Sequence, residues 1–253
     1  MKIGIMGAML EEVSELKKNM QIEATHEIGA REYHCGELYG IDTVLVFSRC
    51  GKVASASTAT TLVGEFDVDY IIFTGVAGAT DSSLNIGDIV IGEKAHQHDM
   101  DATPLFKKHE IPLLGKIFFE ADLDLIEKAY LAASEFLAEG KDLFGSETLA
   151  RFSINEPKVY RGAIASGDKF VAHPLAVEQL LKDVPETMAV EMEGAAVAQI
   201  CFEHQIPFVI IRTISDKADH SAAIDFQSFI DEISAHYSRE IIKKLYYKFQ
   251  DNN

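Results

Sequence analysis

The chain has 253 residues, and 47% of them are hydrophobic, which is enough for one large core or two small ones. Its 40 acidic residues outnumber the 23 basic ones and give a net charge of -17. That balance argues against binding to nucleic acid or to an anionic membrane surface, because both depend on Lys and Arg side chains.

The cysteines Cys35, Cys50 and Cys201 are odd in number and widely spaced. They match neither a disulfide framework nor a zinc-binding pattern, which fits a reducing cytosol. Met1 leads directly into an apolar segment without the features of a signal peptide. No apolar stretch approaches the roughly 18 residues that a membrane-spanning helix needs. We therefore expect a cytoplasmic protein with no contact with a membrane.

Short apolar segments alternate with segments of helical period along the chain, the pattern of an α/β domain. Ligand sites in such domains lie at the carboxyl ends of strands. No linker or repeat divides the chain, so we expect one domain, 1–253, with segment 107–158 as a possible insertion. We predict strands at 2–6, 31–39, 43–48, 70–73, 86–91, 159–165, 188–190 and 208–211, helices at 11–20, 54–63, 123–137, from 194 and at 226–249, and irregular structure at 141–157.

The segment 190–194, Val-Glu-Met-Glu-Gly, places two carboxylates directly after a buried strand. Burying a carboxylate is costly unless it is paired or hydrogen-bonded, so function is one reason to keep it there. Glu193 can accept hydrogen bonds from two adjacent sugar hydroxyls, and Met192 offers a polarizable surface under a ribose ring. The alternative is a helix start where acidic residues favour the positive end of the dipole.

Arg212 and Asp216 follow the predicted strand 208–211, with Ser215 beside the acid. A carboxylic acid kept protonated in an apolar setting can donate a proton to a leaving group. The alternative for Asp216 is a helix cap, and for Arg212 a salt bridge to one of the many acids.

Three other patterns are weaker. The glycines at 4–7 and 75–78 complete neither a dinucleotide fingerprint nor a P-loop. His96 and His98 would share one strand face, but no further Cys or His has matching spacing, so we expect no metal site. Phe170 can stack on a base, although a Phe is more often part of the core.

Taken together, five stretches resemble the bacterial 5′-methylthioadenosine/S-adenosylhomocysteine nucleosidases of the nucleoside phosphorylase/hydrolase superfamily. The resemblance covers almost the whole chain in order and spacing and is weakest over 107–158, which is longer than usual in the family. It implies a nucleoside phosphorylase-like α/β fold with a twisted mixed β-sheet flanked by α-helices. The stretches are GIMGAMLEE at 4–12, TGVAG at 74–78, ASGDKF at 165–170, VEME at 190–193 and RTISD at 212–216.

The resemblance also implies hydrolysis of the bond between adenine and a 5′-thio-substituted ribose, in methionine salvage and removal of S-adenosylhomocysteine. It implies a homodimer without metal or organic cofactor, in which residues Ala102 to Phe106 reach into the partner's pocket. Asp216 would protonate the imidazole nitrogen of adenine, Glu12 would activate the attacking water, and Arg212 would help to place that water. Departure of adenine leaves oxocarbenium character on the ribose, which fits these roles.

The other matching positions are implied to contact the substrate. Glu193 would bind the ribose hydroxyls, Phe170 would stack on adenine, and the backbone of Val171 would recognise the edge of the base. Methionine and phenylalanine side chains suit the apolar thio end of the substrate. The predicted substrate-binding residues are Met9, Cys50, Val76, Ala77, Gly78, Phe170, Val171, Glu191, Met192, Glu193, Ser215 and Phe226.

The sequence departs from the family pattern in three places. Val76 stands where many members carry a Ser, so water placement would depend more on Glu12 and Arg212. Some relatives with Val here also cleave 6-amino-6-deoxyfutalosine, which stays an alternative substrate. Cys50 replaces a commoner aliphatic residue. Residues 102–106 differ from a pattern with one Phe after Val-Thr, which leaves the tolerance for bulky 5′ groups open.

Two other functions compete with hydrolysis. A phosphorylase of the same fold would need a positively charged site that binds phosphate. Segment 48–53 is closer to the nucleosidase pattern, and Glu12 would repel phosphate. A non-catalytic nucleoside-binding protein would be expected to lack Glu12, Glu193 or Asp216, and all three are present.

Overall fold

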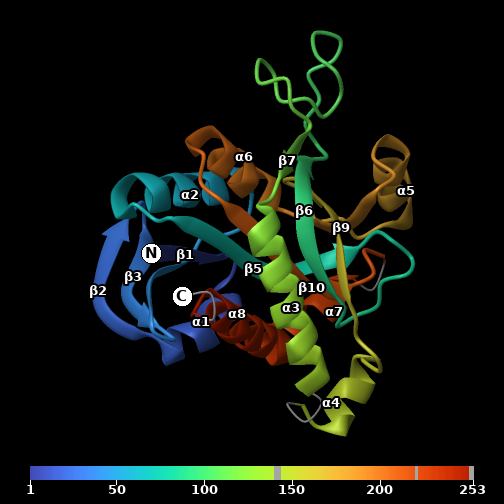
Figure 1. Ribbon diagram of the computed structural model, residues 1–253. Coiled ribbons are helices and arrows are strands. Elements are labelled where there is room, and N and C mark those ends of the chain that lie inside the picture. The colour runs from blue at the N-terminus through green and yellow to red at the C-terminus, as the bar shows by residue number, and fades with distance from the viewer. Residues whose placement is uncertain (140–143, 220–221, 251–253) are drawn as a thin grey trace.

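The computed structural model describes residues 1–139, 144–219 and 222–250. Within these residues a mixed ten-stranded sheet crosses the molecule, and two groups of helices flank it (Figure 1). The strands are β1 (Lys2–Gly7), β2 (Gln21–Ile28), β3 (Arg31–Leu38), β4 (Ile41–Phe47), β5 (Tyr70–Ala79), β6 (Ile89–Gln97), β7 (Phe118–Glu120), β8 (Val159–Ser166), β9 (Thr187–Glu191) and β10 (Phe208–Asp216).

Helices and strands alternate from β8 to β10, as the apolar periodicity predicts, whereas β2 to β4 and β5 to β7 follow one another without an intervening helix. Helices α2 and α6 pack against each other, and α8 packs against both α1 and α3 (Figure 1). No helix among the described residues is long and apolar enough to cross a membrane. The helices are α1 (Leu10–Asn19), α2 (Lys52–Phe66), α3 (Leu123–Glu139), α4 (Ser146–Arg151), α5 (Pro174–Asp183), α6 (Gly194–His204), α7 (Ala222–Phe229) and α8 (Ala235–Gln250), with a π-helical turn at Ile230–Ser234.

Strand β5 is the centre of the sheet. It pairs in parallel with β1 and β10 and antiparallel with β9. Because β10 continues through β6 and β8 to β9, these five strands close into a ring, from which β1, β4, β3 and β2 extend. Every residue of β10, and every residue of β5 after Tyr70, is buried. A strand covered on both faces has this continuous burial, so the polar residues near its end are buried as well.

The structure corrects several predicted boundaries. Strands β5 and β10 extend through segments 74–78 and 212–216, which were predicted to follow the strands. The apolar runs stop earlier because the last residues are polar or small, although their backbones stay in the sheet. The predicted helix 226–249 is α7, a π-helical turn and α8, and α4 forms within the predicted irregular segment 141–157, whose residues 141–143 lie outside the described ranges.

Strands β2 and β7 and helix α5 also had no predicted counterpart. Strand β2 is almost entirely exposed, so it lacks the alternation that signals a half-buried strand. Helix α5 buries only Leu180, with Ala176, Val177 and Leu181 partly buried in a small separate cluster. The loop between β6 and β7 extends away from the body of the molecule (Figure 1).

Candidate active site

One pocket collects the polar residues from the ends of β1, β5, β9 and β10. It encloses about 550 Å³ of space, including its open mouth, which is within the range of small-molecule sites. All the predicted site residues except Arg212 and Ser215 line it. The lining residues are Ala8, Met9, Glu12, Cys50, Val76, Ala77, Gly78, Lys169, Phe170, Val171, Val190, Glu191, Met192, Glu193, Asp216 and Phe226.

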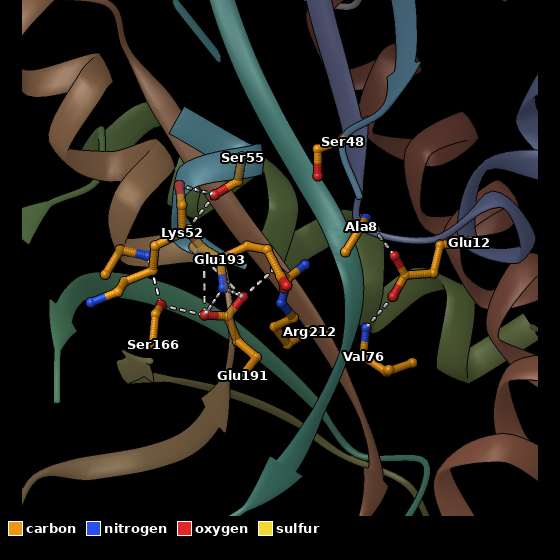
Figure 2. Close-up of polar contacts among 12 residues, drawn as sticks. Ala8, Glu12, Ser48, Lys52, Ser55, Val76, Ser166, Glu191, Glu193 and Arg212 are labelled. Atoms are coloured by element: carbon orange, nitrogen blue, oxygen red, sulfur yellow. Dashed lines mark hydrogen bonds and ion pairs between the residues drawn. The ribbon is translucent and has the colours of Figure 1, made fainter. Parts of the chain in front are cut away.

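Glu12 is held at the start of α1 by backbone N–H groups (Figure 2). Its Oε2 accepts from Ala8 at 2.7 Å and from Met9 at 3.0 Å, and its Oε1 accepts from Val76 at 3.1 Å. Burial raises the pKa of Glu12 above its usual value, while the nearby Arg212 and these N–H groups oppose the rise. The carboxylate is therefore fixed in orientation and easily protonated, as a general base should be.

Arg212 lies behind the pocket wall and is paired with Glu191. Its Nη2 donates to Glu191 Oε2 at 2.5 Å, and its guanidinium lies 4.0 Å from the centre of the Phe73 ring. Glu191 also accepts from the backbone N–H of Gly194 at 2.9 Å and from the hydroxyl of Ser166. The salt bridge that was the alternative interpretation of Arg212 therefore exists, and its partner is a residue of the predicted site.

Glu193 precedes α6 and points toward the loop after β4. Its Oε1 accepts from the N–H of Gly51 at 2.7 Å. Burial, together with the charge of Glu191, raises the pKa of Glu193 to about 8, and Arg212 opposes the rise. Glu191, rather than Glu193, accepts the N–H groups at the start of α6, so Glu193 keeps acceptor capacity for a ligand hydroxyl.

Asp216 is the last residue of β10, and its carboxylate is held on both oxygens. Oδ2 accepts from the Ser215 hydroxyl at 2.8 Å, and Oδ1 accepts from the N–H of Ala218 at 2.8 Å. Ser215 lies outside the pocket lining and orients the acid. Because Asp216 belongs to a strand, the predicted alternative of a helix cap does not describe it.

Apart from Lys169 and Cys50, the remaining wall of the pocket is apolar. The rings of Phe170 and Phe226 meet edge to face with their centres 5.6 Å apart, and Phe170 is 42% exposed. An exposed ring at a pocket edge can take a planar ligand on its face. The side chains of Met9 and Met192 extend this wall.

Cys50 brings a thiol to the same pocket. Burial and the charge of Glu193 raise the pKa of Cys50 to about 11, so the thiol stays neutral at physiological pH. A neutral thiol behaves as a small apolar group, which suits a wall facing an apolar substituent.

Three residues of the lining were absent from the prediction: Ala8, Lys169 and Val190. Each lies inside a stretch that carries the family resemblance, so its position in the motif was the available signal. His96 and His98 do not line the pocket. Among residues 1–139, 144–219 and 222–250, no three His, Cys, Asp or Glu side chains are grouped to hold a metal ion.

Comparison with known proteins identifies the family of the chain. Residues 2–245 match the model of the phosphorylase superfamily. A 5′-methylthioadenosine/S-adenosylhomocysteine nucleosidase of Shewanella loihica is 34% identical over 247 residues, which cover 97% of this chain and 99% of that protein.

Solved structures give the same result. The nucleosidase of the same name from Neisseria meningitidis, in complex with methylthio-immucillin-A, is 33% identical with a TM-score of 0.84, over 98% of this chain and 99% of that one. The futalosine hydrolase of Helicobacter pylori is 30% identical with a TM-score of 0.83, over 98% and 97%. These similarities extend over both chains almost completely. The chain therefore belongs to the phosphorylase superfamily, among its 5′-methylthioadenosine/S-adenosylhomocysteine nucleosidases.

Proposed function

We propose that this enzyme hydrolyses the N-glycosidic bond of 5′-methylthioadenosine and S-adenosylhomocysteine, releasing adenine and the 5′-thio-substituted ribose. The observation that carries the proposal is the separation of three buried carboxylates around one pocket. Glu12, Glu193 and Asp216 come from different elements, and each is held by different donors. An acid, a base and a sugar-binding group are what hydrolysis of a nucleoside requires.

The bond to adenine breaks first. Asp216, in its protonated form, gives its proton to N7 of adenine, and the electron pair of the bond between C1′ and N9 leaves with the base. The base departs as neutral adenine, and positive charge develops on the ribose. A carboxylic acid in this role lowers the barrier because adenine is a poor leaving group as an anion.

Water then attacks the cationic carbon. Glu12, in its ionised form, accepts a proton from the water as the oxygen of that water bonds to C1′. Asp216 is left as a carboxylate and Glu12 as an acid, and exchange of a proton with solvent restores both groups. The fixed orientation of Glu12 contributes here, because an oriented reactant avoids an entropy cost.

The rest of the pocket would bind the parts of the substrate that do not react. Glu193 accepts from the ribose hydroxyls, Met192 packs on the sugar, and Phe170 stacks on adenine beside the backbone of Val171. Met9, Cys50 and Phe226 surround the thio substituent without any charge.

The enzyme acts as a homodimer in the cytoplasm, without metal or organic cofactor, in methionine salvage and removal of S-adenosylhomocysteine. The loop between β6 and β7 supports the dimer, because it extends from the body and leaves Leu105 83% exposed (Figure 1). In this proposal residues 102–106 complete the partner's pocket. Sedimentation equilibrium measures the mass of the protein in solution, and the mass of a monomer would contradict the proposed homodimer.

A second substrate, 6-amino-6-deoxyfutalosine, is favoured by Val76 in the pocket and by the similarity to the futalosine hydrolase. The same acid and base would serve it, because only the 5′ substituent differs. Its turnover relative to methylthioadenosine tests this assignment.

The deciding experiment follows adenine release from methylthioadenosine in phosphate-free buffer and in millimolar phosphate. Equal rates, with free methylthioribose as the second product, are expected for a hydrolase. Release that requires phosphate and yields a sugar phosphate would mean a phosphorylase. No release of adenine in either buffer, together with turnover of 6-amino-6-deoxyfutalosine, would reverse the order of the two substrates.

A further inference from the structure

Two glycines of β5 lie directly opposite functional residues of β10. The register of the two strands pairs Gly75 with Arg212 and Gly78 with Asp216. A Cβ atom placed on Gly75 would lie 2.5 Å from Glu12 Oε1 and 2.9 Å from Arg212 Nη1, and one on Gly78 would lie 2.8 Å from Asp216 Oδ1. Side-chain carbons essentially never approach other heavy atoms within 3.0 Å, so these groups occupy the space of the missing side chains.

The groups over Gly75 are not free to give way. Glu12 is held by three backbone N–H groups, and moving Oε1 breaks the bond from Val76. Arg212 is held between the Phe73 ring and the Glu191 carboxylate. The carboxylate of Glu12 and the guanidinium of Arg212 are therefore held in place, although the side chains of glutamate and arginine are normally flexible.

A donor and an acceptor lie side by side next to Gly75, which is the polarity that a bound water molecule needs. Arg212 is 1% exposed, and its Nη1 has no hydrogen-bond partner among the described residues. This unpartnered donor and the acceptor Oε1 of Glu12 both lie within 3 Å of the position of a Cβ atom on Gly75. A water in front of Gly75 can therefore donate to the carboxylate and accept from the guanidinium.

We propose that Gly75 and Gly78 are positioning residues of the reaction, and that this inference rests on the proposed function. Gly75 lets Arg212 approach Glu12 from behind the pocket wall, where the two groups orient the attacking water, and Gly78 lets Asp216 reach the leaving base. Glycine within a strand often marks such a close approach of other groups. The Gly-x-x-Gly spacing at 75–78 thus serves two carboxylates rather than a nucleotide phosphate.

Substitution of the two glycines by alanine should impair the reaction in different ways. Gly75→Ala displaces the water-activating groups, so any substrate that needs water is hydrolysed slowly. Gly78→Ala displaces only the proton donor, so it slows substrates whose leaving group needs a proton. The 4-nitrophenyl glycoside of methylthioribose distinguishes the two defects, because 4-nitrophenolate leaves as a stable anion without being protonated. For Gly78→Ala, a purely structural defect would slow both substrates equally, whereas for Gly75→Ala it would also raise KM and weaken adenine binding.

The experiment measures kcat and KM of the full chain for methylthioadenosine and for the nitrophenyl substrate. Gly4→Ala is the matched control, because Gly4 lies in the neighbouring strand β1 and its Cβ atom would meet only apolar side chains, of which the nearest is Leu62 at 3.2 Å. Circular dichroism and adenine binding show that each variant is folded.

We expect Gly75→Ala to lower kcat about 100-fold on both substrates with little change in KM, as for a reacting group misplaced by about 1 Å. Gly78→Ala should show a similar loss on methylthioadenosine and nearly normal turnover of the nitrophenyl substrate, and Gly4→Ala should resemble the wild type.

Rates of Gly75→Ala within about threefold of the wild type would overturn the proposal. A threefold change in rate corresponds to only about 0.7 kcal/mol in activation free energy. Equal losses on both substrates would overturn it for Gly78. If Gly75→Ala does not fold, the comparison of the two substrates for Gly78→Ala tests the proposal, because it does not depend on the Gly75 variant. A wild type that releases no adenine from methylthioadenosine and does not cleave the nitrophenyl substrate would overturn the proposed function and this inference together.

Discussion

Glu191 and Arg212 form an ion pair buried beneath the pocket, with 3% and 1% of the two side chains exposed. The same carboxylate accepts from Ser166 of β8 (Figure 2). It also accepts from Gly194 of α6, so one group connects three other elements. Glu191 is thus the main counter-charge of Arg212. Burial therefore dominates over the attraction of Arg212 in raising the pKa values of Glu12 and Glu193.

The first prediction concerns stability. Glu191→Gln should lower the free energy of unfolding by about 3–5 kcal/mol, because it removes the carboxylate that the buried guanidinium of Arg212 is hydrogen-bonded to. Glu120→Gln is the control, since Glu120 pairs with Lys116 at 3.2 Å on the surface and should cost less than about 1 kcal/mol. Urea titrations of both variants measure the difference, and equal costs would contradict the prediction.

The second prediction concerns the attacking water. Glu12→Gln should keep adenine binding within a few-fold of the wild type and lower kcat about 100-fold or more, because the amide accepts no proton. Single-turnover kinetics and calorimetric titration with adenine measure the two effects. Loss of binding together with turnover would mean that Glu12 serves the ligand rather than the water.

The third prediction concerns the leaving base. Asp216→Asn should lower kcat for methylthioadenosine by roughly 10²–10⁴-fold while the fold persists, since the amide cannot protonate adenine. Ser215→Ala should cost less, because it removes only the hydrogen bond to Oδ2 of Asp216. Near-normal turnover of Asp216→Asn, assayed by adenine release, would exclude Asp216 as the acid.

The fourth prediction concerns pH. The pKa of Glu193 is raised to about 8 in the folded enzyme, against 4.5 for an unperturbed Glu. Between these values the folded state binds a proton that the unfolded chain has lost, so the free energy of unfolding falls as pH rises from about 5 to about 8. One such group accounts for a slope of up to about 1.4 kcal/mol per pH unit.

Glu193→Gln removes this titration and should flatten the decline measured by urea unfolding at several pH values. Glu186→Gln is the control, because its pairing with Lys94 lowers the pKa of this half-exposed Glu, so its contribution is constant over the same range. Parallel curves for wild type and Glu193→Gln would show that Glu193 ionises normally.

The candidate site was largely predictable because its residues lie in short segments whose order along the chain is distinctive. Glu12, Glu193 and Asp216 each follow or end a strand, and the carboxyl ends of strands are where α/β domains bind ligands. The pocket gathers these residues as expected. The roles assigned to them remain predictions until the kinetics are measured.

The element boundaries were less predictable. The ends of β5 and β10 are polar or small, so apolar patterning stops before the backbone leaves the sheet. The exposed strand β2 is defined by its ladder with β3, which no local pattern reveals. The π-helical turn before α8 likewise interrupts a continuous amphipathic pattern.

By itself the sequence determined the α/β class and the residue types at the site, because these depend on composition and local order. Only the tertiary structure decided which acid neutralises Arg212 and which glycines make room for Glu12 and Asp216. The glycine contacts follow from the register of β5 against β10, which joins residues more than 130 positions apart, and the ion pair follows from the position of β9 beside β5. Strand pairing is set by the packing of the whole sheet, so the partners of a buried charge are decided there.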